Sequence, residues 1–252
     1  MGEEMGRLVL LRHGESVANA NGLFTGALDV PLTPAGIRES LGGAELVATA
    51  GVAIAAIFSS PLRRARTSAT IAAASLDFDL EGVEFDWRLI ERSYGALTGQ
   101  SKADVLHRYG SQQFRHWRRS VTGMPPRMSE ALHRRLAAQA SFHGLPSEAL
   151  PYTESLRDVI TRLGPFVSER VFPRLRTGES ILLVAHGNSL RAVCAILDKL
   201  DDDEIADLNI PTGHPLVYDF TPELTPVARG GRYLDEESAL AAAAEVAAQG
   251  GT

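Results

Sequence analysis

The stretch LVLLRHGES, residues 8–16, passes from four apolar residues directly into a cluster of charged and polar residues. The apolar run predicts a buried strand that ends at the arginine, histidine and glycine. A closely similar stretch, ILLVAHGNS, occupies residues 181–189. Ligands of open α/β sheets bind beyond the carboxyl ends of the strands. We therefore expect His13 and His186 to face one site, provided that their two strands are neighbours in the sheet.

Outward from these two stretches, apolar runs alternate with helical patterns along most of the chain. A helix start is indicated where a capping residue precedes a proline, as at Thr33 and Pro34. The expected strands and helices occupy residues 8–11, 33–51, 52–58, 59–75, 153–172, 181–185, 189–200 and 215–220. The alternation predicts the α/β class, with a three-layer α/β/α sandwich around a mostly parallel sheet.

The chain of 252 residues is expected to form a single domain, residues 1–252, with two less regular parts. Residues 99–150 are rich in Arg, His and Gln and show little strand pattern, so we interpret them as a helical insertion. Residues from about 235 to 252 are Ala-rich and compatible with a helix, and we interpret them as a flexible C-terminal tail.

The composition argues against several classes of protein. A formal net charge of -6 disfavours a surface built to coat nucleic acid or an anionic membrane, because both need an excess of Lys and Arg. Cys194 is the single cysteine, which excludes an intrachain disulfide and fits a reducing, cytoplasmic location. The sequence contains no apolar run long enough to span a bilayer, and its first residues do not resemble a signal peptide.

Basic and amide side chains accompany the two histidines. Arg12 and Asn19 flank the first of them, Asn188 adjoins His186, and Arg64 lies near the start of an expected helix. Guanidinium groups and helix N-termini bind phosphate, because forked donors and free backbone N–H groups match its oxygens. The expected ligand is therefore a phosphoryl group, which a histidine with a free ring nitrogen would attack.

Five sequence blocks together resemble a known family. LRHGES (11–16) and AHGNSLRA (185–192) are similar to the histidine phosphatase superfamily. The resemblance narrows to the cofactor-dependent phosphoglycerate mutase branch through ERSYGALTG (91–99), HWRRS (116–120) and LNIPTGHPLVYDF (208–220). It extends over about residues 7–235, and it implies the α/β sandwich of that family.

The resemblance implies roles for individual residues. His13 would be the nucleophile that becomes phosphohistidine, Glu91 the general acid and base, and His186 a group that stabilises the transition state. Arg12 and Arg64 would complete the catalytic set by binding the transferring phosphoryl group. The remaining expected substrate-binding residues are Gly14, Glu15, Ser16, Asn19, Thr25, Gly26, Arg92, Ser93, Tyr94, Lys102, Arg118, Arg119, Gly187 and Asn188.

The implied reaction interconverts 3-phosphoglycerate and 2-phosphoglycerate in glycolysis and gluconeogenesis. The phosphohistidine is primed by 2,3-bisphosphoglycerate, and no metal is required. The adjacent Arg118 and Arg119, with Lys102, supply positive charge for a substrate carboxylate, which a simple phosphatase does not need. The implied partners are phosphoglycerates and further copies of the chain, in a homodimer or homotetramer, without nucleic acid or a membrane.

Two other function classes stay open. A phosphomonoesterase of the same superfamily, acting on a small phosphorylated metabolite, would share the histidines and phosphate-binding arginines. A non-catalytic scaffold is disfavoured, because every residue that the chemistry needs is present. The chain also departs from the family pattern in residues 127–150, and it has no lysine after Lys199. A less tightly closed site would admit water and hydrolyse the phosphoenzyme faster, so the balance of mutase and phosphatase activity is left open.

Overall fold

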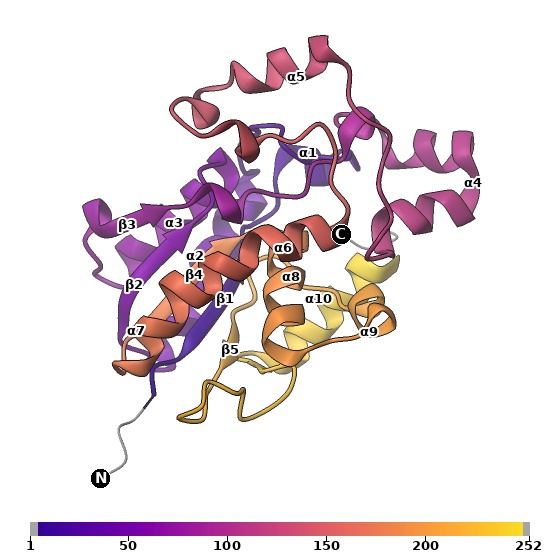
Figure 1. The fold of residues 1–252 in the computed structure, drawn as a ribbon. Coiled ribbons are helices and arrows are strands. Elements are labelled where there is room, and N and C mark those ends of the chain that lie inside the picture. The colour runs from indigo at the N-terminus through magenta and orange to yellow at the C-terminus, as the bar shows by residue number, and fades with distance from the viewer. Residues whose placement is uncertain (1–4, 249–252) are drawn as a thin grey trace.

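A six-stranded sheet forms the centre of the structure, a computed structural model that describes residues 5–248 (Figure 1). The strands are β1 (Leu8–Arg12), β2 (Ile54–Ser59), β3 (Val83–Phe85), β4 (Ser180–Ala185), β5 (Leu216–Tyr218) and β6 (Arg232–Tyr233). Their order across the sheet is β3-β2-β4-β1-β5-β6. The four strands from β3 to β1 run parallel, whereas β5 is antiparallel to both of its neighbours. The predicted α/β class with a mostly parallel sheet is confirmed.

The register of β1 against β4 places the two histidines side by side. Arg12 lies opposite Ala185, so His13 and His186 leave the sheet at equivalent positions. The backbone N–H of His13 also donates a hydrogen bond to the carbonyl oxygen of Ala185, at 3.0 Å. The two strands are therefore neighbours, which was the condition for a shared site.

Helices cover both faces of this sheet (Figure 1). The α-helices are α1 (Val17–Ala20), α2 (Pro34–Thr49), α3 (Arg63–Ser75), α4 (Lys102–Arg119), α5 (Glu130–Ala137), α6 (Leu156–Phe166), α7 (Phe172–Arg176), α8 (Gly187–Asp198), α9 (Asp202–Asp207) and α10 (Glu236–Ala248). A π-helical turn, η6 (Val167–Val171), joins α6 to α7. The 3₁₀ turns are η1 (Leu80–Gly82), η2 (Trp87–Leu89), η3 (Gly95–Leu97), η4 (Ala140–Phe142) and η5 (Ser147–Ala149).

The core is divided by the sheet into two layers. Leu8 and Leu10 of β1 pack in a cluster with residues of α6 and α8, whereas Val9 and Leu11 pack with residues of α2 and α3. A strand covered by helices on both faces buries every side chain, so its sequence is continuously apolar rather than alternating. This burial explains the run that precedes each of the two histidines.

The helix starts follow local capping chemistry. The Thr33 hydroxyl accepts a hydrogen bond from the Gly36 N–H at 3.0 Å, so the predicted start of α2 is confirmed. Ser155 and Asp158 form a reciprocal capping box that starts α6. The helix predicted from residue 59 begins at Arg63 instead, because Ser59 still belongs to β2.

Both of the less regular parts of the chain, the insertion and the C-terminal tail, contain helices. The insertion contains α4, whose backbone turns at Gly110 with φ at 78°, and α5. Leu136 of α5 and the following Phe142 belong to one hydrophobic cluster with Leu62. Residues 236–248 of the predicted tail form α10. The last four residues, 249–252, lie outside the described part of the chain, and the flexibility of the tail stays a prediction.

Candidate active site

Two buried histidines lie together at the carboxyl end of the sheet. The His13 and His186 rings are in edge-to-face contact, with their centroids 4.9 Å apart. The turn after β1 requires glycine at position 14, because a Cβ there would lie 1.9 Å from the carbonyl oxygen of Gly36. The sequence therefore permits the close approach of this turn to α2, and the turn holds His13 at the strand end.

The hydrogen bonds of His13 define which ring nitrogen is free to react. Its Nδ1 lies 2.7 Å from the carbonyl oxygen of Gly14, and a carbonyl only accepts, so Nδ1 carries the proton. Its Nε2 accepts from the Nε of Arg64 at 3.2 Å. Burial, with the charges of Arg64 and Arg12, lowers the pKa of His13 well below its usual value. The ring is therefore neutral at neutral pH, and Nε2 has the lone pair that a nucleophile needs.

Arg64 and Arg12 both provide positive charge close to the His13 ring. The Nη atoms of Arg64 donate to the carbonyl oxygens of Leu28, at 2.6 Å, and Gly26, at 2.9 Å. Burial lowers the pKa of Arg64 to about 10, which leaves it charged at neutral pH. Arg12 donates through Nη1 to Ile210, at 2.8 Å, and its Nε has no hydrogen-bond partner among residues 5–248.

His186 is the N-cap residue of α8, and one of its ring nitrogens forms a hydrogen bond. Its Nε2 lies 2.8 Å from the Ser60 Oγ, and its buried Nδ1 has no hydrogen-bond partner within the described chain. Burial and the charge of Arg64 lower the pKa of His186 well below its usual value. Ser60 was not among the predicted site residues. It follows a predicted strand, as the two histidines do, and this position is the signal that could have identified it.

The Glu91 carboxylate is linked to the start of α8, next to His186. One of its oxygens accepts from the Arg92 N–H at 2.7 Å, and the other lies 3.4 Å from the Asn188 N–H at the start of α8. Asn188 in turn donates through Nδ2 to the Tyr94 hydroxyl at 3.1 Å. The structure thus connects Glu91 and Tyr94, from one sequence block, with Asn188 from another.

A pocket of about 540 Å³ opens beside this group. The predicted site residues that line it are Arg12, Glu15, Asn19, Thr25, Gly26, Glu91, Tyr94 and Lys102. The remaining lining residues were not predicted and are Ala20, Gly22, Leu23, Phe24, Glu39, Ala103, Pro211, Thr212, His214, Ala242, Glu245 and Val246. Three of these belong to α10, so the C-terminal helix forms part of the pocket wall.

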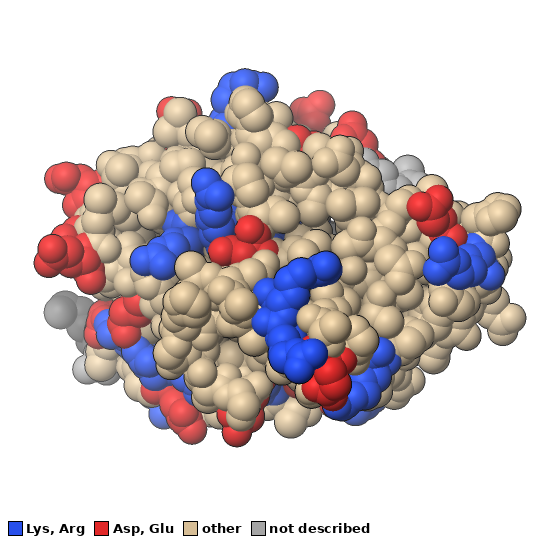
Figure 2. All heavy atoms as spheres, turned by 90° about the horizontal axis from the view of Figure 1, so that it is seen from above, with Lys and Arg blue, Asp and Glu red and all other residues tan. Residues whose placement is uncertain are grey.

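The pocket is lined by side chains of both charges, with Arg12 and Lys102 among four glutamates, Glu15, Glu39, Glu91 and Glu245. Burial and the charges of Arg118 and Arg12 lower the pKa of Lys102 to about 7. Burial raises the pKa of Tyr94, but the cations Arg92 and Arg118 lower it more. On the face seen in Figure 2, basic and acidic side chains are likewise interspersed rather than gathered into a wide basic surface. Binding of an anion would therefore depend on individual cations such as Arg12 and Lys102 and not on a broad positive field.

Several predicted substrate contacts have other partners in the structure. Arg92 is buried, lies over the Tyr94 ring at 4.5 Å and donates to the carbonyl oxygen of Trp117. Arg118 is buried with its guanidinium over the Phe24 and Phe114 rings. Arg119 donates to the backbone of residues 206 and 208 and to the Asn209 side chain. None of these three arginines lines the pocket as the described residues define it, and their contacts with substrate stay predictions.

Other predicted residues have local structural contacts. Ser16 caps α1, and its hydroxyl donates to the Asn19 side chain at 2.7 Å. The N–H of Ser93 donates to the carboxylate of Glu154 at 2.8 Å. Gly187 is the first residue of α8 and is buried. These contacts explain why such residue types stand at these positions, and roles in substrate binding stay predictions for them.

The described part of the chain holds neither a cluster of metal-binding side chains nor a membrane-spanning helix. Within residues 5–248, no three His, Cys, Asp or Glu side chains gather as ligands for a metal ion. Over the same part of the chain, no helix combines the length and the apolar character needed to cross a bilayer.

The fold and the site define an α/β protein in which two buried, adjacent histidines lie at the carboxyl end of a mostly parallel sheet. The family model of the histidine phosphatase superfamily (branch 1) matches residues 8–141 and 127–229. The chain belongs to the histidine phosphatase superfamily, as the RHG and AHGNS blocks predicted.

Curated relatives of similar length carry one common name. A protein of Corynebacterium efficiens named 2,3-bisphosphoglycerate-dependent phosphoglycerate mutase is 47% identical over 246 residues, which is 98% of each chain. A protein of Thermobifida fusca with the same name is 45% identical and covers 98% of this chain and 100% of its own. The resemblance to the mutase branch is confirmed at the level of sequence.

Solved structures of similar fold carry the names of hydrolases. A mycobacterial glucosyl-3-phosphoglycerate phosphatase in complex with VO3 aligns with a TM-score of 0.67 and 27% identity, over 85% of this chain and 92% of its own. A protein described as mycobacterial hydrolase 1 aligns with a TM-score of 0.69 and 25% identity. The fold is therefore shared by mutases and phosphatases.

Proposed function

We propose that the protein interconverts 3-phosphoglycerate and 2-phosphoglycerate through a phosphorylated His13, as part of glycolysis and gluconeogenesis. The observation that carries the proposal is the neutral His13 ring, whose Nε2 lone pair faces Arg64 beside the pocket that Arg12 and Glu91 line. The names of relatives with 44–47% identity over nearly the whole chain support the choice of reaction.

The chemistry follows from the positions of these side chains. An N–P bond forms at the His13 Nε2 while the ester P–O bond breaks, and the electron pair of that bond stays on the departing oxygen. Arg12 and Arg64 offset the charge on the transferring phosphoryl oxygens, and the free Nδ1 edge of His186 lies nearby. Glu91 gives a proton to the departing oxygen and takes one from the substrate hydroxyl in the return transfer.

The residues of the pocket fit the primer 2,3-bisphosphoglycerate. The buried Nε of Arg12 lacks a hydrogen-bond partner among the described residues, and Lys102 lines the same pocket. Arg12 and Arg64 would hold the phosphate next to His13, and Lys102 would approach the rest of the anion. When bound, 2,3-bisphosphoglycerate supplies the phosphoryl group that charges His13. Activity is expected to survive exhaustive chelation with EDTA, and loss that added Mn²⁺ restores would contradict a metal-independent reaction.

A phosphomonoesterase acting on a small phosphorylated metabolite is the second candidate. The similarity to a phosphatase structure at 27% identity favours it. Glu245, which α10 brings to the pocket lining, adds a negative charge there that would disfavour a doubly anionic phosphoglycerate. Both candidates use the same nucleophile and differ in whether the phosphoenzyme reacts with a glycerate hydroxyl or with water.

A paired assay distinguishes the two reactions. Conversion of 3-phosphoglycerate to 2-phosphoglycerate is measured with and without catalytic 2,3-bisphosphoglycerate, while phosphate release is followed in parallel. Turnover that the bisphosphate stimulates, with little free phosphate, is expected of a mutase. Phosphate release faster than isomerisation would establish a phosphatase. The His13→Ala variant controls for both, because it keeps the fold but has no nucleophile.

The proposed function also implies partners and a cellular location for the protein. The proposed partners are phosphoglycerates and further copies of this chain in a homodimer or homotetramer, with neither nucleic acid nor membrane. The proposed location is the cytoplasm, where a glycolytic enzyme and a single reduced cysteine are both expected.

A further inference from the structure

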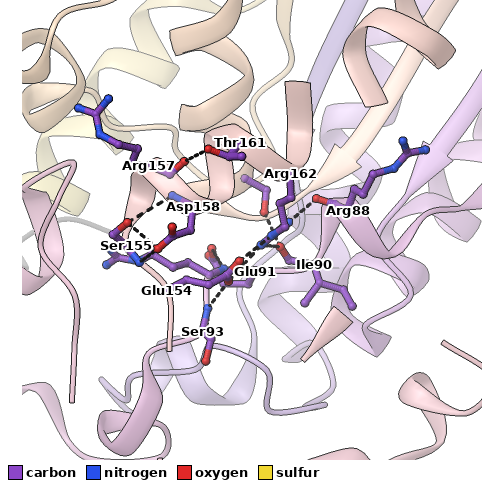
Figure 3. Close-up of polar contacts among 12 residues, drawn as sticks. Arg88, Ile90, Glu91, Ser93, Glu154, Ser155, Arg157, Asp158, Thr161 and Arg162 are labelled. Atoms are coloured by element: carbon purple, nitrogen blue, oxygen red, sulfur yellow. Dashed lines mark hydrogen bonds and ion pairs between the residues drawn. The ribbon is translucent and has the colours of Figure 1, made fainter. Parts of the chain in front are cut away.

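Arg162 of α6 reaches across to the loop that carries Glu91 (Figure 3). Its two Nη atoms donate to the carbonyl oxygens of Arg88 and Ile90, the second at 2.7 Å. Its Nε donates to the Glu154 carboxylate at 2.8 Å. A guanidinium is planar and forked, so one side chain can hold three acceptors in a fixed arrangement. Arg162 therefore ties the residues just before Glu91 to α6.

Glu154 holds the other side of the same loop. Its carboxylate accepts from the Ser93 N–H at 2.8 Å, and its own N–H donates to the Ser93 carbonyl oxygen at 3.0 Å. The side chains of Arg162 and Glu154 are only 11% and 5% exposed. A buried ion pair that loses one partner leaves an uncompensated charge, so each side chain depends on the other.

These contacts enclose the position of Glu91. Ile90 and Ser93, which the pair binds, lie on either side of it in the chain. The hydroxyl of Ser189 in α8 also donates to the Ile90 carbonyl oxygen, at 2.9 Å, so the loop is linked to the helix that follows His186. Among residues 5–248, no hydrogen bond joins the Glu91 carboxylate to α6, so Arg162 is connected to Glu91 through the loop backbone.

We propose that Arg162 and Glu154 are positioning residues that aim the Glu91 carboxylate at the ester oxygen of the substrate. The proposal rests on the proposed function only in assigning proton transfer to Glu91. Neither positioning residue lines the pocket as the described residues define it. Proton transfer is sensitive to small displacements, and a misplaced group loses much of its contribution of about 10²-fold to 10⁴-fold in rate.

The test compares two substrates, one whose leaving group needs a proton and one whose leaving group does not. Turnover of 3-phosphoglycerate needs a proton to be taken from its hydroxyl and given to the alkoxide that departs from the bisphosphoglycerate. The nitrophenolate that leaves p-nitrophenyl phosphate is stable without a proton. The variants are Arg162→Gln, Arg162→Lys and Glu154→Gln. The matched control is Arg157→Gln, because Arg157 lies on the same helix and forms an exposed ion pair with Asp202.

The expected result is a change in kcat that depends on the leaving group. Arg162→Gln and Glu154→Gln should lower kcat for 3-phosphoglycerate by about tenfold or more, with little change in KM or in the rate of the nitrophenolate burst that accompanies phosphorylation of His13 by p-nitrophenyl phosphate. Arg162→Lys, which keeps the charge but not the fork, should lie between these variants and the wild type. Arg157→Gln should leave both rates unchanged. Equal losses with both substrates, or unchanged kcat in the variants, would overturn the proposal.

Glu91→Gln separates this proposal from the function on which it rests. If Glu91→Gln shows the dependence on leaving group and the Arg162 and Glu154 variants do not, the positioning role is wrong and the role of Glu91 stands. If Glu91→Gln shows no such dependence, the proton-transfer role itself is wrong, and the positioning proposal fails with it. Thermal unfolding of each variant identifies those that fold, and Arg162→Lys decides by the same criterion if Arg162→Gln does not fold.

Discussion

The Nε of Arg64 donates a hydrogen bond to the Nε2 of His13 across 3.2 Å, so the guanidinium occupies the lone pair that would attack phosphorus. The same guanidinium is held by the Leu28 and Gly26 carbonyl oxygens. An arriving phosphate offers charged acceptors, which bind guanidinium more strongly than a neutral imidazole does. Phosphate binding is therefore expected to transfer this donor from His13 to the ligand and to free the nucleophile.

Arg64→Gln is expected to raise the pKa of His13 and to slow phosphoryl transfer. Burial lowers the pKa of His13 most, and the Arg64 charge lowers it further, so loss of this charge moves the pKa upward. Loss of a donor to the transferring oxygens costs about 10²-fold to 10³-fold in kcat. NMR titration of the His13 ring measures the first effect, and the mutase assay measures the second. A His13 pKa that stays the same or falls would contradict the electrostatic role.

The stability of the protein is expected to fall as the pH decreases below about 6.5. The pKa of a histidine is 6.5 in the unfolded chain, and burial lowers it for His13 and His186 in the fold. The unfolded state therefore binds more protons, and the free energy of unfolding decreases by up to about 1.4 kcal/mol per pH unit for each histidine.

Urea unfolding at about pH 7.5 and about pH 5.5 measures this dependence. His13→Gln should reduce the difference between the two pH values, because it removes one buried titrating ring. His107→Gln is the control, since His107 is exposed on α4 and should leave the difference unchanged. Identical pH dependence in wild type and His13→Gln would show that the buried ring does not titrate as expected.

Affinity for phosphoglycerate is expected to weaken as the pH rises past about 7. Burial and the charges of Arg118 and Arg12 lower the pKa of Lys102 to about 7, so the amine is charged below this pH and neutral above it. A bound anion favours the charged form, so binding near neutral pH should take up a proton. Calorimetry in buffers of different ionisation enthalpy measures this uptake. It should disappear in Lys102→Met and persist in a variant of Lys199, the only other lysine.

Replacement of Arg118 and Arg119 by Ala is expected to impair use of glycerates far more than hydrolysis of an artificial phosphoester. Arg119 now donates to Asn209 at 2.7 Å and to the carbonyl oxygen of Ala206 at 3.1 Å, so contact with substrate requires an exchange of partners. The Arg119→Ala variant alone keeps the buried Arg118 and serves as the milder test. Comparison of KM for the two substrates is the measurement, and parallel losses would remove the assignment of a carboxylate contact.

Much of the site could be predicted because it depends on short-range sequence. The two His-Gly turns follow continuous apolar runs, and such runs indicate central strands whether or not their neighbours are known. Glu91 was different, since nothing in its local pattern separates it from other surface carboxylates, and only the family resemblance pointed to it. Ser60 resembled an ordinary helix-capping residue, and its contact with His186 depends on the adjacency of β2 and β4.

Long-range contacts explain what the sequence could not predict. Arg162 and Glu154 occupy an ordinary amphipathic region, and their role appears only when α6 packs beside the Glu91 loop. The Ala-rich C-terminal segment has no residue pattern that marks a binding surface, yet Glu245 lines the pocket. The strands β3 and β6, at the two edges of the sheet, were also missed, because such short strands have little pattern of their own.

The sequence by itself determined the α/β class and the pair of histidines at strand ends, because apolar periodicity and glycine turns are local properties. The tertiary structure decided which histidine nitrogen is free, where Arg118 and Arg119 find their partners, and how α10 and α6 approach the site. These features depend on burial and on hydrogen bonds between residues far apart in the chain, such as Arg64 with His13 and Arg162 with Ile90. Strand register and helix packing bring such pairs together, and local sequence patterns do not predict these contacts.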